Sequence, residues 1–351
     1  MYVTGEKLLR KNNNFDAIRF SAALFVFIGH AYGLMGLGNV ELLSLLTGKR
    51  YLFTSVGLAI FFSMSGFLVC RSLVTSVSIR EFLLKRFLRI WPAYTVCILF
   101  CILFAGLLLT SLPATTFLIH PQTAAFFFIN ISLLSSTMPL PGITGAVNPS
   151  IWTIPVEVRL YLLLLLIFLL ARLRFKKWSL QFLLVIWLAQ IFIPRQLLHT
   201  LFKPHILLSI QLGTYFIMGA CFYLYKEKIA LKFNIWLILL AYWLSLHIWF
   251  REYVDVAEHP FFVYSLMWIA FRWSRMPFIK ADLSYGIYLF GGPVEIIVER
   301  TAGQHLTFAL YLLITASCTA ILAILSWYLI EKRALSLKLS RPPVSSQYDL
   351  S

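Results

Sequence analysis

Runs of predominantly apolar residues recur along the whole of this 351-residue chain. Many are about 20 residues long, enough to cross the ~30 Å hydrocarbon core of a bilayer as an α-helix. Because lipid offers the backbone no hydrogen-bond partners, a spanning segment must satisfy its own polar groups, as a helix does. With 60% hydrophobic and 13% charged residues, the chain holds more apolar sequence than a soluble core absorbs. The sequence therefore predicts an all-α polytopic membrane protein.

We expect ten of these runs to span the bilayer: 15–35, 52–73, 91–111, 151–171, 179–195, 205–225, 233–250, 259–273, 283–299 and 306–330. A further apolar piece, 122–138, is shorter, contains Asn130 and ends in the string MPLPGITGAVNPS. A run this short is more typical of an interfacial or re-entrant segment. No small-residue cleavage site follows the first run, so we expect it to be retained as the first helix.

The formal net charge of +16 is distributed unevenly among the loops. If the N-terminus is cytoplasmic and 122–138 does not cross, most of the 30 Lys and Arg residues lie on the cytoplasmic side. Positive residues mark cytoplasmic loops, so this arrangement favours a bundle of about ten helices with both termini inside. The charge is then a feature of topology, and no nucleic-acid partner is expected. We expect a transmembrane domain over 1–334 and a short polar cytoplasmic tail over 335–351.

The first predicted helix carries three ionisable residues, Asp16, Arg19 and His30. Such groups are costly inside a membrane and are functional candidates by default. Arg19 and His30 are 11 residues apart, so they share one helix face about 16 Å apart along its axis. A histidine can take and give a proton near neutral pH. The alternative is a histidine that only hydrogen-bonds a neighbouring helix, and the co-facial arginine favours a functional role.

A basic cluster follows the second predicted span, in the string REFLLKRFLRIWPAY. Arg86 and Arg89 are three residues apart, so on a helix they point to one side. Paired guanidinium groups bind phosphates well, and Lys85 adds a further positive charge. The alternative is an ordinary basic cluster that meets anionic lipid headgroups.

The second and fourth predicted spans contain further polar positions. Ser63, Ser65 and Gly66 interrupt a bulky helix, either for close helix packing or to leave room for a substrate, and the sequence leaves both open. Glu157 lies four residues before Tyr161 on one face, and the segment begins near Trp152.

Trp152 could be an interfacial anchor beside a surface pair of Glu157 with Arg159, or Glu157 could orient His30 as an acid partner. Asp282 is a plausible N-cap for the ninth span, whose outer half holds Glu295. The five cysteines all lie in apolar segments without ligand spacing, so no metal site is expected.

Six strings occur in this order: FDAIRFSAALFVFIGH from Phe15, Ser65-Gly66-Phe67, RFLRIWPAY from Arg86, Trp152 with Glu157 and Tyr161, LSYGIY from Leu283 and YLIEK from Tyr328. Together they resemble the pattern of the membrane acyltransferase 3 family, along residues 15 to 334. There are departures: Phe20 stands where a glycine is common, and Gly291 and Gly292 stand where many members place a His-containing stretch.

The resemblance implies transfer of acyl groups, usually acetyl, from cytoplasmic acyl-CoA to a saccharide beyond the bacterial inner (plasma) membrane. It implies that His30 is catalytic and that Arg86 and Arg89 contact acyl-CoA. We extend these roles by expecting Glu157 to orient His30 or neutralise its charged form, and Arg19 to line the donor path or pair with Asp16. Supporting or substrate-contacting roles are expected for Asp16, Ser65, Trp152 and Tyr161.

The hypothesis is thus a multi-pass O-acyltransferase with acetyl-CoA or another acyl-CoA as donor substrate and no tightly bound cofactor. Its acceptor would be a saccharide, which could be lipid-linked, and its remaining partners membrane lipids. The alternative is a transporter or flippase of small anions or lipid-linked saccharides that uses the same buried Arg and His as ligands. Transporters often show repeats and broken helices, and neither is evident in this sequence.

Overall fold

The computed structural model describes residues 13–133, 138–171, 174–192, 200, 203–250, 253–273 and 281–337. These residues form helices joined by loops, and the described ranges contain no strand. The longer helices are α1 (Phe15–Leu34), α3 (Phe53–Thr75), α4 (Ile79–Phe100), α7 (Pro121–Ile131), α8 (Thr153–Ala171), α9 (Phe175–Phe192), α11 (Pro204–Leu224), α12 (Phe233–Trp249), α13 (Val254–Arg272), α14 (Ser284–Ala302) and α15 (Phe308–Ser326). The short ones are η3 (Gly38–Val40), α2 (Leu42–Leu46), η4 (Cys101–Gly106), α5 (Leu107–Leu109), α6 (Ala114–Ile119), η7 (Gly303–His305), η8 (Trp327–Glu331) and α16 (Lys332–Ser336).

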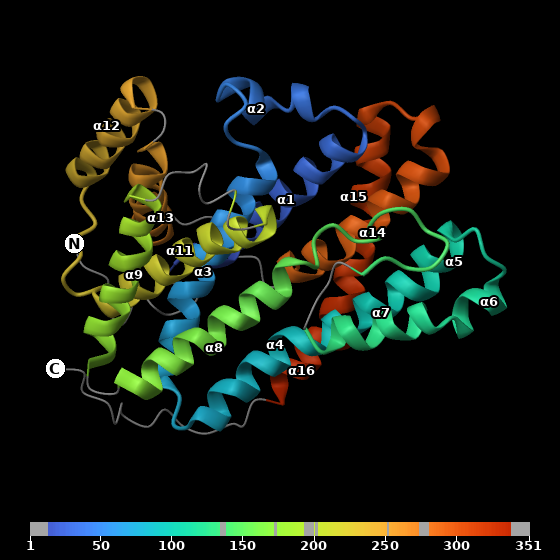
Figure 1. Cartoon of the computed structure of the whole chain (residues 1–351), viewed down its shortest axis with the longest axis horizontal. Coiled ribbons are helices and arrows are strands. Elements are labelled where there is room, and N and C mark those ends of the chain that lie inside the picture. The colour runs from blue at the N-terminus through green and yellow to red at the C-terminus, as the bar shows by residue number, and fades with distance from the viewer. Residues whose placement is uncertain are drawn as a thin grey trace.

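The helices stack in a series around α3. This helix packs between α11 and α1, α1 also packs against α14, and α14 packs against α15 (Figure 1). The helices α9, α12 and α13 gather beyond α11, while α4 and α7 lie side by side elsewhere in the bundle. The all-α prediction is confirmed for the part of the chain that the structure describes.

Six helical segments are long and apolar enough to cross a membrane: Phe15–Leu34, Phe53–Thr75, Ile79–Leu109, Thr153–Ala171, Pro204–Leu224 and Phe308–Ser336. A seventh apolar helix, α12, is shorter. The other expected spans are present as α9, α13 and α14, with part of the predicted 179–195 outside the described residues. Ten spans and cytoplasmic termini stay predictions. The third predicted span is part of a longer helical segment, since helix begins at Ile79 and already contains Arg86 and Arg89.

The described part of the apolar piece 122–138 forms a short helix that ends at Ile131, and residues 134–137 lie outside the described residues. Helix α7 has 11 residues, which rise about 16 Å, roughly half the hydrocarbon thickness. The Trp91 indole N–H of α4 donates to the Ile131 carbonyl at 3.2 Å and ties the end of α7 to α4. This length agrees with the expectation of a segment that does not cross by itself.

Helices α3 and α11 approach each other at two glycines. A side chain built at Gly66 would meet the backbone of Phe216, and one at Gly219 would meet the backbone of Ser63. Close contact of this kind uses small residues to bring helix backbones together. Of the two interpretations of this segment, close packing therefore applies to Ser63 and Gly66, while Ser65 lines a cavity.

The Gly66→Ala variant is expected to lower the free energy of unfolding by about 1–3 kcal/mol. Its new methyl group would clash with the backbone of Phe216, which cannot rotate away as a flexible side chain could. Thermal unfolding of the detergent-solubilised protein measures the effect. Gly33→Ala is the matched control, since Gly33 is helical and has open space around it. Equal unfolding temperatures for the two variants would contradict this account of the contact.

Candidate functional site

Two cavities meet at a group of arginines. The first, here called the basic cavity, has a volume of about 490 Å³ and is lined by Asn13, Phe15, Asp16, Arg19, Leu68, Arg71, Ser72, Thr75, Arg86, Arg89, Asp282, Trp327 and Leu335. The second, the central cavity, has a volume of about 100 Å³. Its lining residues are Arg19, Leu58, Phe61, Phe62, Met64, Ser65, Leu68, Val69, Arg86, Arg89, Ile90, Thr153, Ile154, Glu157, Tyr161, Ser284, Tyr285 and Tyr288. Arg19, Leu68, Arg86 and Arg89 line both, so three arginines and one leucine form the boundary between the cavities.

Asp282 holds two of the three arginines. Its Oδ2 accepts hydrogen bonds from Arg19 Nη1 at 2.7 Å and from Arg89 Nη2 at 2.9 Å, and its Oδ1 accepts from the Ser284 hydroxyl at 2.5 Å. Burial disfavours a charged Asp282, but the guanidinium groups of Arg89 and Arg19 outweigh it and hold the pKa of this carboxyl below its ordinary value. The ion pairs therefore fix where Arg19 and Arg89 point.

These contacts correct two expectations. The residue at the N-cap of α14 is Leu283, not Asp282, and no side chain caps the helix there. Arg19 forms its ion pair with Asp282 rather than with Asp16, although Asp16 lines the same basic cavity. The Asp282 carboxylate is drawn away from its own helix because two half-buried guanidinium groups offer stronger, charge-assisted hydrogen bonds.

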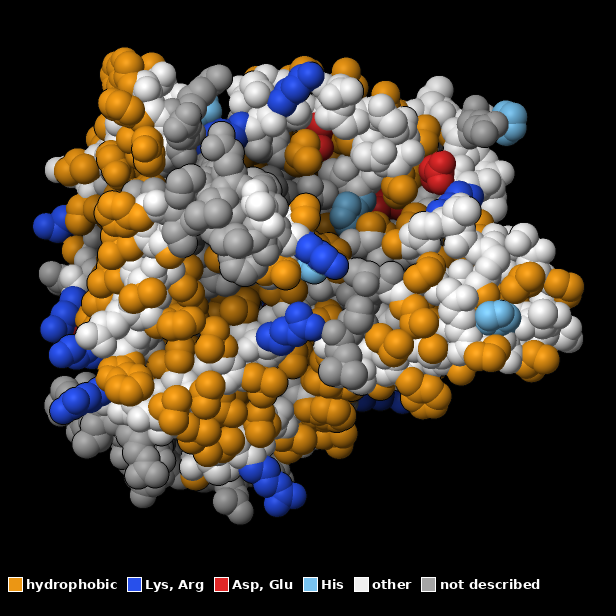
Figure 2. All heavy atoms as spheres, viewed as in Figure 1, with side chains coloured by type: hydrophobic (Ala, Val, Ile, Leu, Met, Phe, Trp, Pro, Cys, Tyr) orange, Lys and Arg blue, Asp and Glu red, His pale blue; other side chains and the backbone are white. Residues whose placement is uncertain are grey.

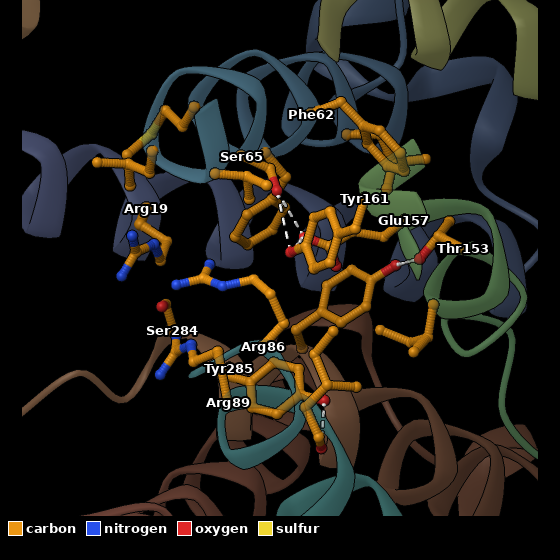
Figure 3. Close-up of a pocket in the computed structure, with 18 residues that line it drawn as sticks. Arg19, Phe62, Ser65, Arg86, Arg89, Thr153, Glu157, Tyr161, Ser284 and Tyr285 are labelled. Atoms are coloured by element: carbon orange, nitrogen blue, oxygen red, sulfur yellow. Dashed lines mark hydrogen bonds between the residues drawn. The ribbon is translucent and has the colours of Figure 1, made fainter. Parts of the chain in front are cut away.

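Arg86 and Arg89 differ in their surroundings. Arg89 is matched by the carboxylates of Asp282 and, at 3.6 Å, Glu331. Arg86 donates to the Ser72 hydroxyl at 3.4 Å and lies over the ring of Tyr161, while its buried Nε has no hydrogen-bond partner among the described residues. Figure 3 shows the guanidinium groups of Arg19, Arg86 and Arg89 gathered on one side of the central cavity. Arg86 thus differs from Arg19 and Arg89 in having no ion pair with a carboxylate among the described residues.

A hydroxyl–carboxylate cluster lies opposite the arginines in Figure 3. Ser65 Oγ donates to Glu157 Oε1 at 2.7 Å, and the Tyr161 hydroxyl donates to the same oxygen. Glu157 and Tyr161 are on α8, whereas Ser65 is on α3, so the cluster joins two helices across the cavity. The structure thus brings Ser65, Glu157 and Tyr161 together as site residues. Trp152 packs against the hydrophobic core instead and is not among the lining residues of either cavity.

His30 lies beyond the opposite end of the central cavity from the arginines. Its Nδ1 is 3.4 Å from Ser150 Oγ. The Ser150 carbonyl accepts hydrogen bonds from the hydroxyls of Thr153 and Tyr288, and both of these residues line the central cavity. The expected contact between Glu157 and His30 is not formed, because the Glu157 carboxylate is already bound by Ser65 and Tyr161. Ser150, in the loop before α8, takes the orienting position.

Helices α1 and α14 run parallel. Arg19 pairs with Asp282, a side chain at Gly291 would contact the ring of Phe27, and one at Gly303, just after α14, would contact Met35. The separation in sequence between neighbouring residues is thus 263 at Arg19, 264 at Phe27 and 268 at Met35, so it grows by about one helical turn along α1. His30 is three residues after Phe27, on the same helix stripe, and lies level with Glu295.

Glu295 is a buried carboxylate that sequence reasoning noted but did not use. It is fully buried, and neither of its carboxylate oxygens has a hydrogen-bond partner among the described residues. Figure 2 shows a hollow in one face of the molecule with a histidine side chain recessed in it, whereas the fully buried Glu295 is not part of that surface. A buried unpartnered carboxylate is unusual and calls for a functional explanation.

Comparisons with known proteins find similarity along most of the chain. A family model described as "Acyltransferase domain" matches residues 12–329. A protein named "O-acetyl transferase" from Shigella phage Sf6 is 27% identical, over 93% of this chain and 97% of its own. A protein named "Nodulation protein 10" from Rhizobium leguminosarum bv. viciae is 30% identical, over 93% of this chain and 94% of its own. No solved structure matches the chain.

Proposed function

The chain belongs to the acyltransferase family whose model it matches, and from this premise we propose that it transfers an acyl group, acetyl in the simplest case, from cytoplasmic acyl-CoA to a saccharide hydroxyl. The observation that carries the proposal is the pair of cavities that meet at Arg19, Arg86 and Arg89, with His30 beyond the far end of the second. Acyl-CoA has its phosphates at one end of the long pantetheine arm and its thioester at the other. This matches an arginine-lined cavity followed by a second cavity that leads toward His30.

The basic cavity is the proposed site for the CoA phosphates. Four arginines and two acidic residues line it, so it keeps a net positive charge even with Asp282 ionised. Arg86, with donors not used by the protein, would contact phosphate directly. Arg89 and Arg19, held by Asp282, would add positive potential from fixed positions.

The central cavity is the proposed path of the pantetheine arm. Its small volume and largely apolar wall, with Phe61, Phe62 and Ile90, fit a thin, mostly uncharged chain. The cluster of Ser65, Glu157 and Tyr161 offers hydrogen bonds to the amides of that arm part of the way along. The thioester would then arrive near Thr153 and Tyr288, which are one hydrogen bond from Ser150 and, through Ser150, two from His30.

His30 is the proposed general base. Ser150 engages Nδ1, which leaves Nε2 to take the proton of the acceptor hydroxyl. The hydroxyl oxygen forms a bond to the thioester carbonyl carbon, the carbon–sulfur bond breaks, and the proton on His30 passes to the leaving thiolate. A transient acyl-histidine is a variant of this route, in which Nε2 attacks the thioester first.

The function is tested by incubating the purified protein in lipid nanodiscs with labelled acetyl-CoA and glycan acceptors, and by mass spectrometry of surface glycans from cells with and without the intact gene. Transfer of the label and an acyl mass that depends on the gene are expected. A transporter or flippase would move its substrate with no new acyl mass on any glycan, and that result would overturn the proposal.

The Glu295→Gln variant is expected to lower kcat roughly tenfold or more, because its carboxylate lies level with His30 and would stabilise the imidazolium formed during transfer. The KM for acetyl-CoA and the unfolding temperature should stay at wild-type values, since Glu295 lines neither cavity. Glu299→Gln, one turn later on α14, is the matched control. A variant with unchanged kcat would remove Glu295 from the mechanism.

A further inference from the structure

A third cavity, of about 280 Å³, lies at the other end of α3 from the arginines. We call it the tyrosine cavity, after Tyr51 and Tyr215 in its wall. Ser55, near the start of α3, lines the tyrosine cavity, whereas Ser72, near the end of the same helix, lines the basic cavity. The 17 residues between them rise about 25 Å. The two cavities are therefore separated by most of the thickness of a hydrocarbon core.

The tyrosine cavity adjoins the central cavity. Leu58 of α3 lines both, so a single side chain contributes to the wall of each. The remaining wall comes from Arg50 and Tyr51, just before α3, and from residues of α11 and α13. Helices α3, α11 and α13 all begin at this end, which is the outer end in the topology predicted from loop charge.

A hydrogen-bonded network forms the polar wall of the tyrosine cavity. Glu258 accepts from the Tyr51 hydroxyl at 2.6 Å through one oxygen and from the Tyr215 hydroxyl at 2.7 Å through the other. Arg50 Nη2 lies 3.7 Å from the same carboxylate. These bonds hold two phenols, one carboxylate and one guanidinium in fixed positions around a space large enough for a small ligand.

This set of groups favours a neutral, hydroxyl-rich ligand. The carboxylate and guanidinium neutralise each other, so the wall gives no net attraction for an anion of the kind the basic cavity attracts. Carboxylate and phenol oxygens accept from ligand hydroxyls, whereas Arg50 and the Gln211 amide donate to them. The rings of Tyr51 and Tyr215 add apolar faces beside those polar atoms.

We propose that the tyrosine cavity binds the saccharide acceptor, and that the acceptor reaches the thioester past Leu58. This inference rests on the proposed acyltransferase function. Donor and acceptor then approach from opposite ends of α3. The acceptor hydroxyl to be acylated leaves the tyrosine cavity toward the central cavity, while the rest of the sugar stays on the network around Glu258.

The test uses three variants of the full chain in nanodiscs, with methyl glycosides of glucose, rhamnose and N-acetylglucosamine as probes. Glu258→Gln and Tyr215→Phe remove parts of the network, and Leu208→Trp fills the cavity without touching Glu258. Ile206→Trp, on the same helix but outside the cavity wall, is the control for Leu208→Trp. Glycoside binding is measured by isothermal titration, and transfer from acetyl-CoA by release of CoA.

We expect each of the three variants to weaken binding of at least one glycoside roughly ten- to a hundredfold, while affinity for acetyl-CoA stays unchanged. Ile206→Trp should bind like the wild type. Failure of the wild type to bind any of the three glycosides, or equal binding by wild type and all three variants, would overturn the proposal. Glycoside binding that the variants abolish, without any transfer by the wild type, would support the cavity and overturn the proposed function.

Discussion

Purified protein with the substitution His30→Ala is expected to lose acetyl transfer by about a hundredfold or more while binding acetyl-CoA as tightly as the wild type. His30 lies beyond the end of the central cavity, joined to it through Ser150 and the hydroxyls of Thr153 and Tyr288. It does not line the basic cavity, where the phosphates would bind. Removing the imidazole should therefore stop proton transfer and leave donor binding intact.

Two measurements separate these effects. Release of CoA in the presence of a glycan acceptor reports transfer, and isothermal titration with a non-hydrolysable acetyl-CoA analogue reports donor binding. His305→Ala is the matched control, since His305 is an exposed histidine at the end of η7, the short helix after α14. Normal transfer by the His30 variant would show that the catalytic assignment is wrong, and joint loss of transfer and binding would point to a structural role.

The Arg86→Ala variant is expected to raise the KM for acetyl-CoA roughly ten- to a hundredfold, the effect of losing a hydrogen bond to a charged group. Arg86 has a buried donor without a protein partner, whereas Arg89 is matched by Asp282 and Glu331. Arg89→Ala would leave two buried carboxylates without that partner, so this variant should also lose thermal stability. Arg86→Ala with Arg89→Ala should combine weak donor binding with lower stability.

Acetyl-pantetheine gives this prediction a sharper control. It carries the same thioester arm without the nucleotide and its phosphates, so Arg86→Ala should affect its KM far less than that of acetyl-CoA. Arg80→Ala tests a basic residue of the same helix that is exposed and lines neither cavity. If Arg86→Ala raises the KM for acetyl-CoA and the KM for acetyl-pantetheine by the same factor, Arg86 does not contact phosphate.

The sequence predicted helices well, because long apolar runs leave the backbone few alternatives in lipid. Several candidate residues from the sequence also lie close together in the structure. Arg19, Arg86 and Arg89 meet where the two cavities join. Ser65, Glu157 and Tyr161 form one hydrogen-bonded cluster. Both results depend on local information: hydropathy over about 20 residues and short motifs.

The partners of those residues were harder to predict. Asp282 lies 263 positions from Arg19, so no local spacing reveals their ion pair, and its position before α14 suggested an N-cap instead. Glu157 was assigned to His30, but Ser65 and Tyr161 already bind its carboxylate. Ser150 and Glu295 acquire their relation to His30 only when the loop before α8 and the helix α14 pack beside α1.

The placement of Arg19 and His30 on one helix has a consequence for which donors the protein can use. Arg19 and His30 are carried by one continuous helix, whose rise sets them about 16 Å apart. On the proposed function, α1 then fixes the distance between the arginines, where the phosphates bind, and His30, where the thioester reacts. Donor choice would depend on the reach of the arm as much as on the acyl group. A phosphorylated thioester with a much shorter arm would bind at the arginines and fall short of His30.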